Sequence, residues 1–119
     1  MPNILIGTAS WTDPTLLKSK RFYPPQAKTA EARLRHYAEN FPIVEVDSTY
    51  YALPSYRNAE LWAERTPEPF VFNIKVFRFF THHQTQTKVL PANVQSELGD
   101  LQGRNLYYPD APAAIKDEL

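Results

Sequence analysis

Residues 43–49 read IVEVDST, and this alternation of apolar and polar residues decides the fold. Successive side chains of a strand point to opposite faces. One face of the predicted strand therefore carries Val44, Val46 and Ser48, and the other carries Glu45, Asp47 and Thr49. If helices cover the first face, the second face lies toward the interior, where carboxylates are costly unless they are paired or coordinated.

The segments on either side of this strand carry helix and strand signals in turn. Thr29 and Ser55 are suitable N-caps, each placed before a run of apolar residues at helical spacing. The predicted elements are strands at 3–9, 43–49 and 70–77 and helices at 29–40 and 55–65. Strands that alternate with helices predict an α/β fold in which right-handed crossovers join the strands of a parallel sheet.

The other segments have weaker patterns. Residues 10–28 are rich in proline and polar residues and are predicted to form a long loop, as are residues 81–88. Helical spacing of apolar residues appears at 91–101 and again at 113–119, whereas 105–112 is expected to be irregular.

Length and composition exclude several classes of protein. The chain has 119 residues, which suits one domain but not a complete TIM-type barrel of about 250 residues. Its 13 Lys and Arg balance its 13 Asp and Glu, so net charge gives no support to a nucleic-acid partner. The absence of cysteine excludes thiolate chemistry, and three glycines are too few for a dinucleotide fingerprint or a P-loop.

The sequence also predicts where the protein is found in the cell. No apolar run approaches the length of a membrane span. The first seven residues lack the basic segment and the apolar stretch of a signal peptide. We therefore expect a cytoplasmic protein with no membrane partner.

Three charged residues are the candidates for catalysis. Asp47 and Glu45 are expected to act as general acid or base, and Lys75 on the third strand is expected to be their electrostatic or proton-transfer partner. Active sites of α/β folds lie at the carboxyl ends of the strands, which favours Asp47 over the deeper Glu45. The alternative is a buried ion pair that fixes the register of the strands.

A second group of residues is predicted to bind a ligand at the same end of the sheet. Aromatic side chains such as Trp11 and Tyr51 stack on sugar rings or bases, and Arg78 together with Lys75 suits a phosphate or carboxylate. A divalent metal held by Glu45, Asp47 and His82 is a weaker hypothesis, because no histidine spacing typical of metal sites is present. The candidate ligand-binding residues are Trp11, Thr49, Tyr51, Arg78 and His82, and the cofactor is unknown.

Four ordered motifs resemble those of a known family. They are GTASW at 7–11, FYP at 22–24, VEVDSTYYALP at 44–54 and WAERTP at 62–67, which is followed by FVFNIK at 70–75 and by TH at 81–82. The family is the uncharacterised domain of unknown function 72, called YecE-like. Two positions depart from its usual form, since Ala9-Ser10 stands where Ser-Gly is usual and Asp47 stands where Asn is common.

The resemblance implies a TIM-type barrel of which residues 1–119 would be a single incomplete domain, about the first half. The resemblance implies no established reaction. The positions that it marks as site candidates are Trp11, Glu45, Asp47, Thr49, Tyr51, Lys75 and His82. A half barrel would leave strand edges and an apolar interior exposed, so we expect the isolated chain to dissolve poorly or self-associate.

Several functions stay open on the sequence alone. The first is a ligand or catalytic site for a small polar, sugar-like or phosphate-bearing molecule at the strand ends, with a metal-dependent phosphodiesterase or nuclease as a subtype. The others are a non-catalytic binding module and a truncated product without independent function. Whether the protein is an enzyme is therefore undecided at this stage.

Overall fold

The computed structural model describes residues 3–119 and groups them into two compact units. The sheet unit comprises residues 3–47 and 54–74, and the C-terminal unit comprises residues 48–53 and 75–119. Met1 and Pro2, which begin the stretch compared with a signal peptide, lie outside the described residues.

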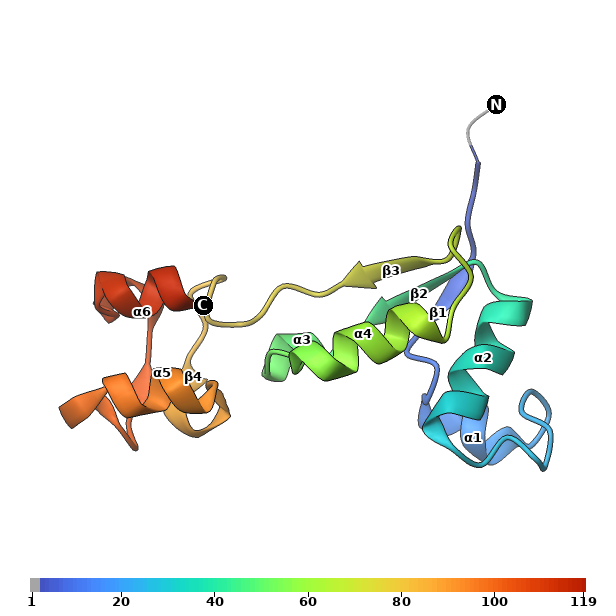
Figure 1. Cartoon of the computed structure of the whole chain (residues 1–119), viewed down its shortest axis with the longest axis horizontal. Helices are drawn as coiled ribbons and strands as arrows, with labels where there is room; N and C mark the ends of the chain where they lie inside the picture. The colour runs from blue at the N-terminus through green and yellow to red at the C-terminus, as the bar shows by residue number, and fades with distance from the viewer. Residues whose placement is uncertain (1–2) are drawn as a thin grey trace. The chain divides into compact units, whose positions relative to one another are not determined.

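Three short parallel strands form the sheet of the sheet unit (Figure 1). They are β1 (Gly7–Ala9), β2 (Ile43–Val46) and β3 (Val71–Ile74), in the spatial order β1-β2-β3. The register pairs Thr8 with Val44 and Val44 with Phe72. Strands that are consecutive in the sequence are thus neighbours and parallel, which confirms the predicted α/β class with a parallel sheet.

β1 and β2 approach each other too closely for a side chain at Gly7. A Cβ atom at this position would overlap the carbonyl oxygen of Ile43, which belongs to the backbone of β2. Backbone atoms cannot swing aside as the end of a flexible side chain can. Only glycine therefore fits at the start of β1.

The two predicted helices of the sheet unit are confirmed, with their caps. α2 (Ala30–Asn40) begins after Thr29, whose Oγ1 accepts a hydrogen bond from Ala32 N at 3.1 Å. α4 (Tyr56–Glu64) begins after Ser55, whose Oγ accepts one from Asn58 N at 3.1 Å. Each hydroxyl satisfies one of the N–H groups that the first turn of a helix leaves unpaired.

A further short helix, α1 (Pro14–Ser19), lies within the segment predicted to be a long loop. Asp13 Oδ2 caps it by accepting hydrogen bonds from Thr15 N at 2.8 Å and Leu16 N at 3.3 Å. Pro14 at the first helical position already has a helical φ. The loop prediction was wrong here because the proline was taken as a breaker rather than as a helix start.

One face of the sheet is packed with aromatic side chains. Its buried members are Tyr37 from α2 and Val44 and Val46 from β2. Half-buried apolar residues surround them: Trp11, Leu16, Phe22, Phe41, Trp62, Phe70 and Phe72. Because α2 supplies Tyr37 and α4 supplies Trp62, both helices cover this same face, as Figure 1 also shows.

The strands are shorter than predicted. β1 begins only at Gly7, and Ile4 and Ile6 before it are 84% and 70% exposed, so the prediction of a buried strand from residue 3 was wrong over its first half. β2 ends at Val46 and β3 at Ile74. Residues 3–6 carry an apolar run that no neighbouring strand of the described chain pairs with.

The C-terminal unit consists of short elements. They are α3 (Ser48–Tyr51), β4 (Thr85–Gln86), η1 (Thr87–Val89), α5 (Ala92–Glu97), η2 (Gly99–Leu101), β5 (Asn105–Leu106), η3 (Tyr108–Asp110) and α6 (Ala113–Glu118). The helical patterns at 91–101 and 113–119 are confirmed by α5, η2 and α6. β4 and β5 pair antiparallel and occupy parts of segments that were expected to be loop and irregular.

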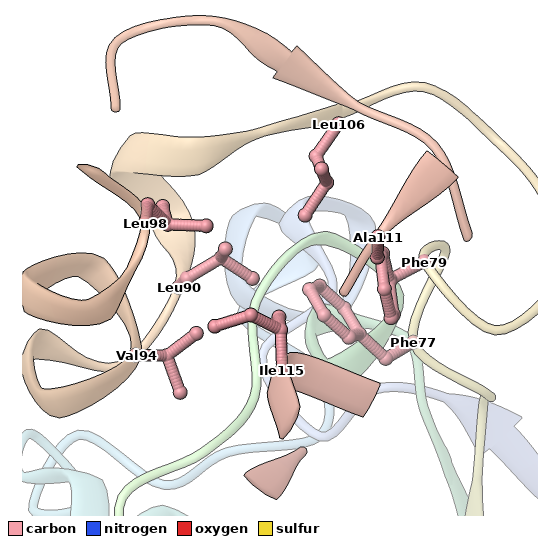
Figure 2. Packing of buried hydrophobic residues seen from close by; sticks show 8 residues of the cluster. All are labelled: Phe77, Phe79, Leu90, Val94, Leu98, Leu106, Ala111 and Ile115. Atoms are coloured by element: carbon pink, nitrogen blue, oxygen red, sulfur yellow. The ribbon is translucent and has the colours of Figure 1, made fainter. Parts of the chain in front are cut away.

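This unit has a hydrophobic core of its own, shown in Figure 2. Its eight buried residues are Phe77, Phe79, Leu90, Val94, Leu98, Leu106, Ala111 and Ile115. Complete burial of one large apolar side chain contributes about 1.5–3 kcal/mol. The short helices are too short to be stable alone, so this cluster is what holds them together.

Membrane-spanning helices are absent from residues 3–119. No helix in that range combines the length and the apolar character that crossing a bilayer requires.

Candidate functional site

The carboxyl ends of β1 and β2 bring polar residues to one edge of the sheet. Ser10 follows β1 and Asp47 follows β2, and the backbone N–H of Ser10 donates to the carbonyl oxygen of Glu45 at 2.8 Å. The φ angle of Ser10 is +72°, in the left-handed region that favours glycine. The resemblance noted above places a glycine at this position, and the backbone conformation gives the physical reason for it.

Asp47 has the most unusual environment at this edge. Its Oδ1 atom is buried and has no hydrogen-bond partner within the described residues. A buried carboxylate oxygen without a partner is costly, and most such atoms in folded proteins are satisfied by protein, water or ligand. The sequence singled out Asp47, and the structure shows an oxygen there that is able to accept a hydrogen bond.

Glu45 lies on the opposite face of the sheet from the aromatic core. The register pairs it with Ala9 and Asn73, and its side chain is exposed in the described chain. A shallow hollow of about 240 Å³ lies at this face, lined by Gly7, Thr8, Glu45 and Asn73 among others. The alternation predicted for β2 is confirmed, and it directs Glu45 away from the helix-covered face.

Trp11 is part of the aromatic core and is half-buried. Its ring meets Trp62 edge-on at 5.6 Å and Phe72 at 6.4 Å between centroids. Its carbonyl oxygen accepts a hydrogen bond from the hydroxyl of Tyr23. Trp11 therefore lies on the helix-covered face, and the structure does not bring its ring to the same face as Glu45.

Thr49 lies on α3 of the C-terminal unit, not on a strand. The prediction that it continues the polar face of Glu45 and Asp47 was wrong, because β2 ends at Val46 and the chain turns into a helix at Ser48. The Thr49 side chain is buried, and its hydroxyl donates to the carbonyl oxygen of Lys75 at 2.6 Å. Thr49 thus fixes the backbone of a candidate catalytic residue.

Lys75 and Arg78 lie over the ring of Tyr50 in the C-terminal unit. Lys75 Nζ is 5.0 Å from the ring centroid and Arg78 Cζ is 5.5 Å from it. Arg78 Nε is buried and has no hydrogen-bond partner within residues 3–119. Asp47 belongs to the sheet unit and Lys75 to the C-terminal unit, so their pairing stays a prediction.

Tyr51 and His82 are the remaining candidates, and both are exposed. Tyr51 is 61% exposed and meets Tyr50 edge-on at 5.1 Å. His82 has a φ angle of +62° and stacks on Tyr108 at 5.2 Å between centroids. Across the described residues 3–119, no three His, Cys, Asp or Glu side chains gather in a way that would hold a metal ion.

Sequence reasoning missed the roles of two tyrosines. The Tyr37 hydroxyl hydrogen-bonds the backbone of β1 and β2, and Tyr37 lies in a helix predicted only from the spacing of its apolar residues. The Tyr50 ring contacts two cations, and Tyr50 was not among the candidate site residues. Aromatic residues in a helical pattern are most often core, and no pattern in the sequence distinguishes a hydroxyl that binds backbone.

Comparison with known proteins confirms the family resemblance given by the sequence motifs. The family model described as "Protein of unknown function DUF72" matches residues 5–106. Over 81 residues the chain is 38% identical to the UPF0759 protein YunF of Bacillus subtilis (strain 168). That alignment covers 68% of this chain and 27% of YunF, so the chain spans about a quarter of the relative that it matches. No solved structure matches the chain.

Proposed function

Because the chain belongs to the DUF72 family of proteins of unknown function and spans only about a quarter of its relative YunF, we propose that its three strands form part of a TIM-type barrel with a ligand site at their carboxyl ends. Support comes from the parallel order β1-β2-β3 and from helices that cover one face of the sheet. In such a barrel the other face, which carries Glu45 and Asn73, would line the interior.

The ligand that we propose is a small polar molecule, sugar-like or phosphate-bearing. The observation that carries this proposal is the buried Asp47 Oδ1 atom without a partner at the end of β2. A hydroxyl of a ligand would supply the missing donor. At the mouth of a barrel, a carboxylate in this position is also placed to act as a general base.

The other candidates have supporting roles in this proposal. Glu45 would line the interior below Asp47, and Lys75, which directly follows β3, would be the electrostatic partner. Thr49 would position Lys75 through its backbone carbonyl group.

A thermal-shift panel of sugars, polyols and sugar phosphates tests the Asp47 site. We expect a ligand that raises the melting temperature of the wild-type chain to have no such effect on Asp47→Leu, which roughly keeps the size of the side chain but has no oxygen to accept the hydrogen bond. Asp117→Leu is the matched control, because Asp117 is exposed in α6 of the C-terminal unit. An equal response of wild type and Asp47→Leu to every member of the panel would rule the site out.

The same samples distinguish an enzyme from a binding module. The ligand recovered after incubation is analysed by NMR. Its conversion to a product, lost in Asp47→Leu, identifies catalysis, whereas unchanged ligand that still raises the melting temperature identifies a binding module.

A further inference from the structure

Two cations share one aromatic ring in the C-terminal unit. Lys75 Nζ and Arg78 Cζ lie 5.0 Å and 5.5 Å from the centroid of the Tyr50 ring. Both distances are within the range of about 6 Å in which a ring face attracts a cation. The ring offsets part of the repulsion between two like charges, but it carries no full negative charge.

The backbone holds both cationic residues in place. Thr49 Oγ1 donates to the carbonyl oxygen of Lys75 at 2.6 Å, and Arg78 N donates to the carbonyl oxygen of Tyr50 at 2.9 Å. Thr49 and Tyr50 are neighbours on α3, so one helical turn positions the ring and the two residues around it. A site whose parts are fixed before binding loses less entropy when a ligand arrives.

Within residues 3–119, neither of the two cations forms an ion pair with a carboxylate. The ion pairs among residues 3–119 join Arg35 to Glu31 and Arg57 to Glu60 and Glu64. Neither Lys75 nor Arg78 takes part in one, and Arg78 Nε is buried with no acceptor in the described chain. A guanidinium N–H that is withdrawn from water and left unpaired is costly. An acceptor with negative charge would satisfy it and would also relieve the repulsion between the two cations.

From this geometry we propose that Lys75 and Arg78, beside Tyr50, bind a phosphate group. A phosphate carries up to two negative charges and several acceptor oxygens, which suits an arginine fork and a lysine ammonium group together. A carboxylate has a single charge and leaves one cation unmatched. The contacts of this site lie wholly within the C-terminal unit and do not include Asp47, although Lys75 is also the partner proposed above for Asp47.

Inorganic phosphate is the probe that tests this proposal. Isothermal titration calorimetry on the whole chain measures its affinity, with chloride at equal ionic strength as the reference. We expect wild type to bind phosphate and Lys75→Gln to bind it about tenfold more weakly, the loss typical of one charge-assisted contact. Arg78→Gln is expected to weaken phosphate binding by at least as much, since it removes the charge and also the paired N–H donors of the guanidinium group.

Lys116→Gln is the matched control. Lys116 Nζ lies over a tyrosine ring in the same unit, 4.5 Å from the centroid of Tyr108. We expect this variant to bind phosphate as wild type does. Far-UV circular dichroism checks that each variant is folded. If Arg78→Gln does not fold, the phosphate affinity of Lys75→Gln alone tests the proposal, because Lys75 is exposed. Absence of phosphate binding in wild type, or equal weakening in Lys75→Gln and Lys116→Gln, would overturn the proposal.

Discussion

The backbone N–H of Thr8 donates a hydrogen bond to the hydroxyl oxygen of Tyr37 at 2.8 Å. The same hydroxyl donates to the carbonyl oxygen of Ile43 at 3.1 Å. One fully buried side chain from α2 thus joins the edge strand β1 to the first residue of β2. Since β1 has only three residues, this bridge is a large part of what holds it in the sheet.

Replacing Tyr37 with phenylalanine tests the bridge. Tyr37→Phe keeps the ring but removes the hydroxyl, which leaves the Thr8 N–H without its acceptor. We expect the free energy of unfolding to fall by about 1–3 kcal/mol, the cost of a buried polar group left unpaired. Urea unfolding followed by tryptophan fluorescence measures it, because Trp11 and Trp62 both lie in the sheet unit. Tyr56→Phe, at a tyrosine that is 90% exposed, should change stability by a few tenths of that amount.

The backbone of Ser10 is expected to be strained, and a glycine at this position would relieve the strain. Its φ angle of +72° costs a residue with a Cβ atom roughly 1–2 kcal/mol relative to glycine. Its hydroxyl opposes this cost, because Ser10 Oγ accepts a hydrogen bond from Thr12 N at 3.0 Å. Ser10→Ala loses the hydrogen bond and keeps the strain, whereas Ser10→Gly loses both.

The comparison of these two variants isolates the strain. We expect Ser10→Gly to be more stable than Ser10→Ala by about 1 kcal/mol in the same urea titration. Equal stabilities would mean that the left-handed conformation of Ser10 carries no strain.

How much of the fold the sequence could predict depends on whether a signal is local. The caps Thr29 and Ser55 act on N–H groups two or three residues away, and both helices that they begin are confirmed. The exposed Ile4 and Ile6 show the opposite case, because a strand forms only where another strand pairs with it. Their apolar character predicted burial, but pairing with β2 starts at Gly7.

The same distinction applies to the candidate site. The alternation of residues 43–46 is confirmed. The amino-acid sequence continues the same apolar–polar alternation as far as Thr49, but the strand ends at Val46 and α3 begins at Ser48. What holds that turn is a hydrogen bond from Thr49 to Lys75, 26 residues further along the chain. No local pattern reports such a contact, so the sequence predicted Asp47 at the end of a strand but missed the placement of Thr49.

Removing the Thr49 hydroxyl is expected to loosen the C-terminal unit. Thr49→Val keeps the shape of this buried side chain and breaks the 2.6 Å hydrogen bond to the Lys75 carbonyl oxygen. We expect a loss of about 1–2 kcal/mol and a faster hydrogen exchange of the Arg78 amide, which donates to the neighbouring Tyr50. Thr49→Ser retains the hydroxyl and should keep slow exchange at Arg78. If Thr49→Val exchanges as slowly as wild type, the hydroxyl does not position this turn.

Tyr23 makes the stability of the sheet unit depend on alkaline pH. Burial raises the pKa of the Tyr23 phenol from 10.0 to about 12, the Tyr37 phenol adds to the rise, and Arg33 opposes it. Folding therefore favours the neutral phenol, which donates to the carbonyl oxygen of Trp11. The stabilisation is complete below pH 10, where the unfolded chain is also neutral, and it is lost as pH rises from about 10 to about 12.

The loss of stability is measured as a difference between two proteins, because the ordinary pKa values of lysine and tyrosine side chains lie in the same pH range. The free energy of unfolding in urea is determined at pH 9 and pH 11 for wild type and for Tyr23→Phe. We expect it to fall more in wild type, by about 1 kcal/mol, which is below the full linkage value because the phenol is partly exposed. Tyr56→Phe is the control and should fall as wild type does, since Tyr56 is exposed. A fall of the same size in wild type and in Tyr23→Phe would show that the Tyr23 phenol ionises equally well in the folded and unfolded chains.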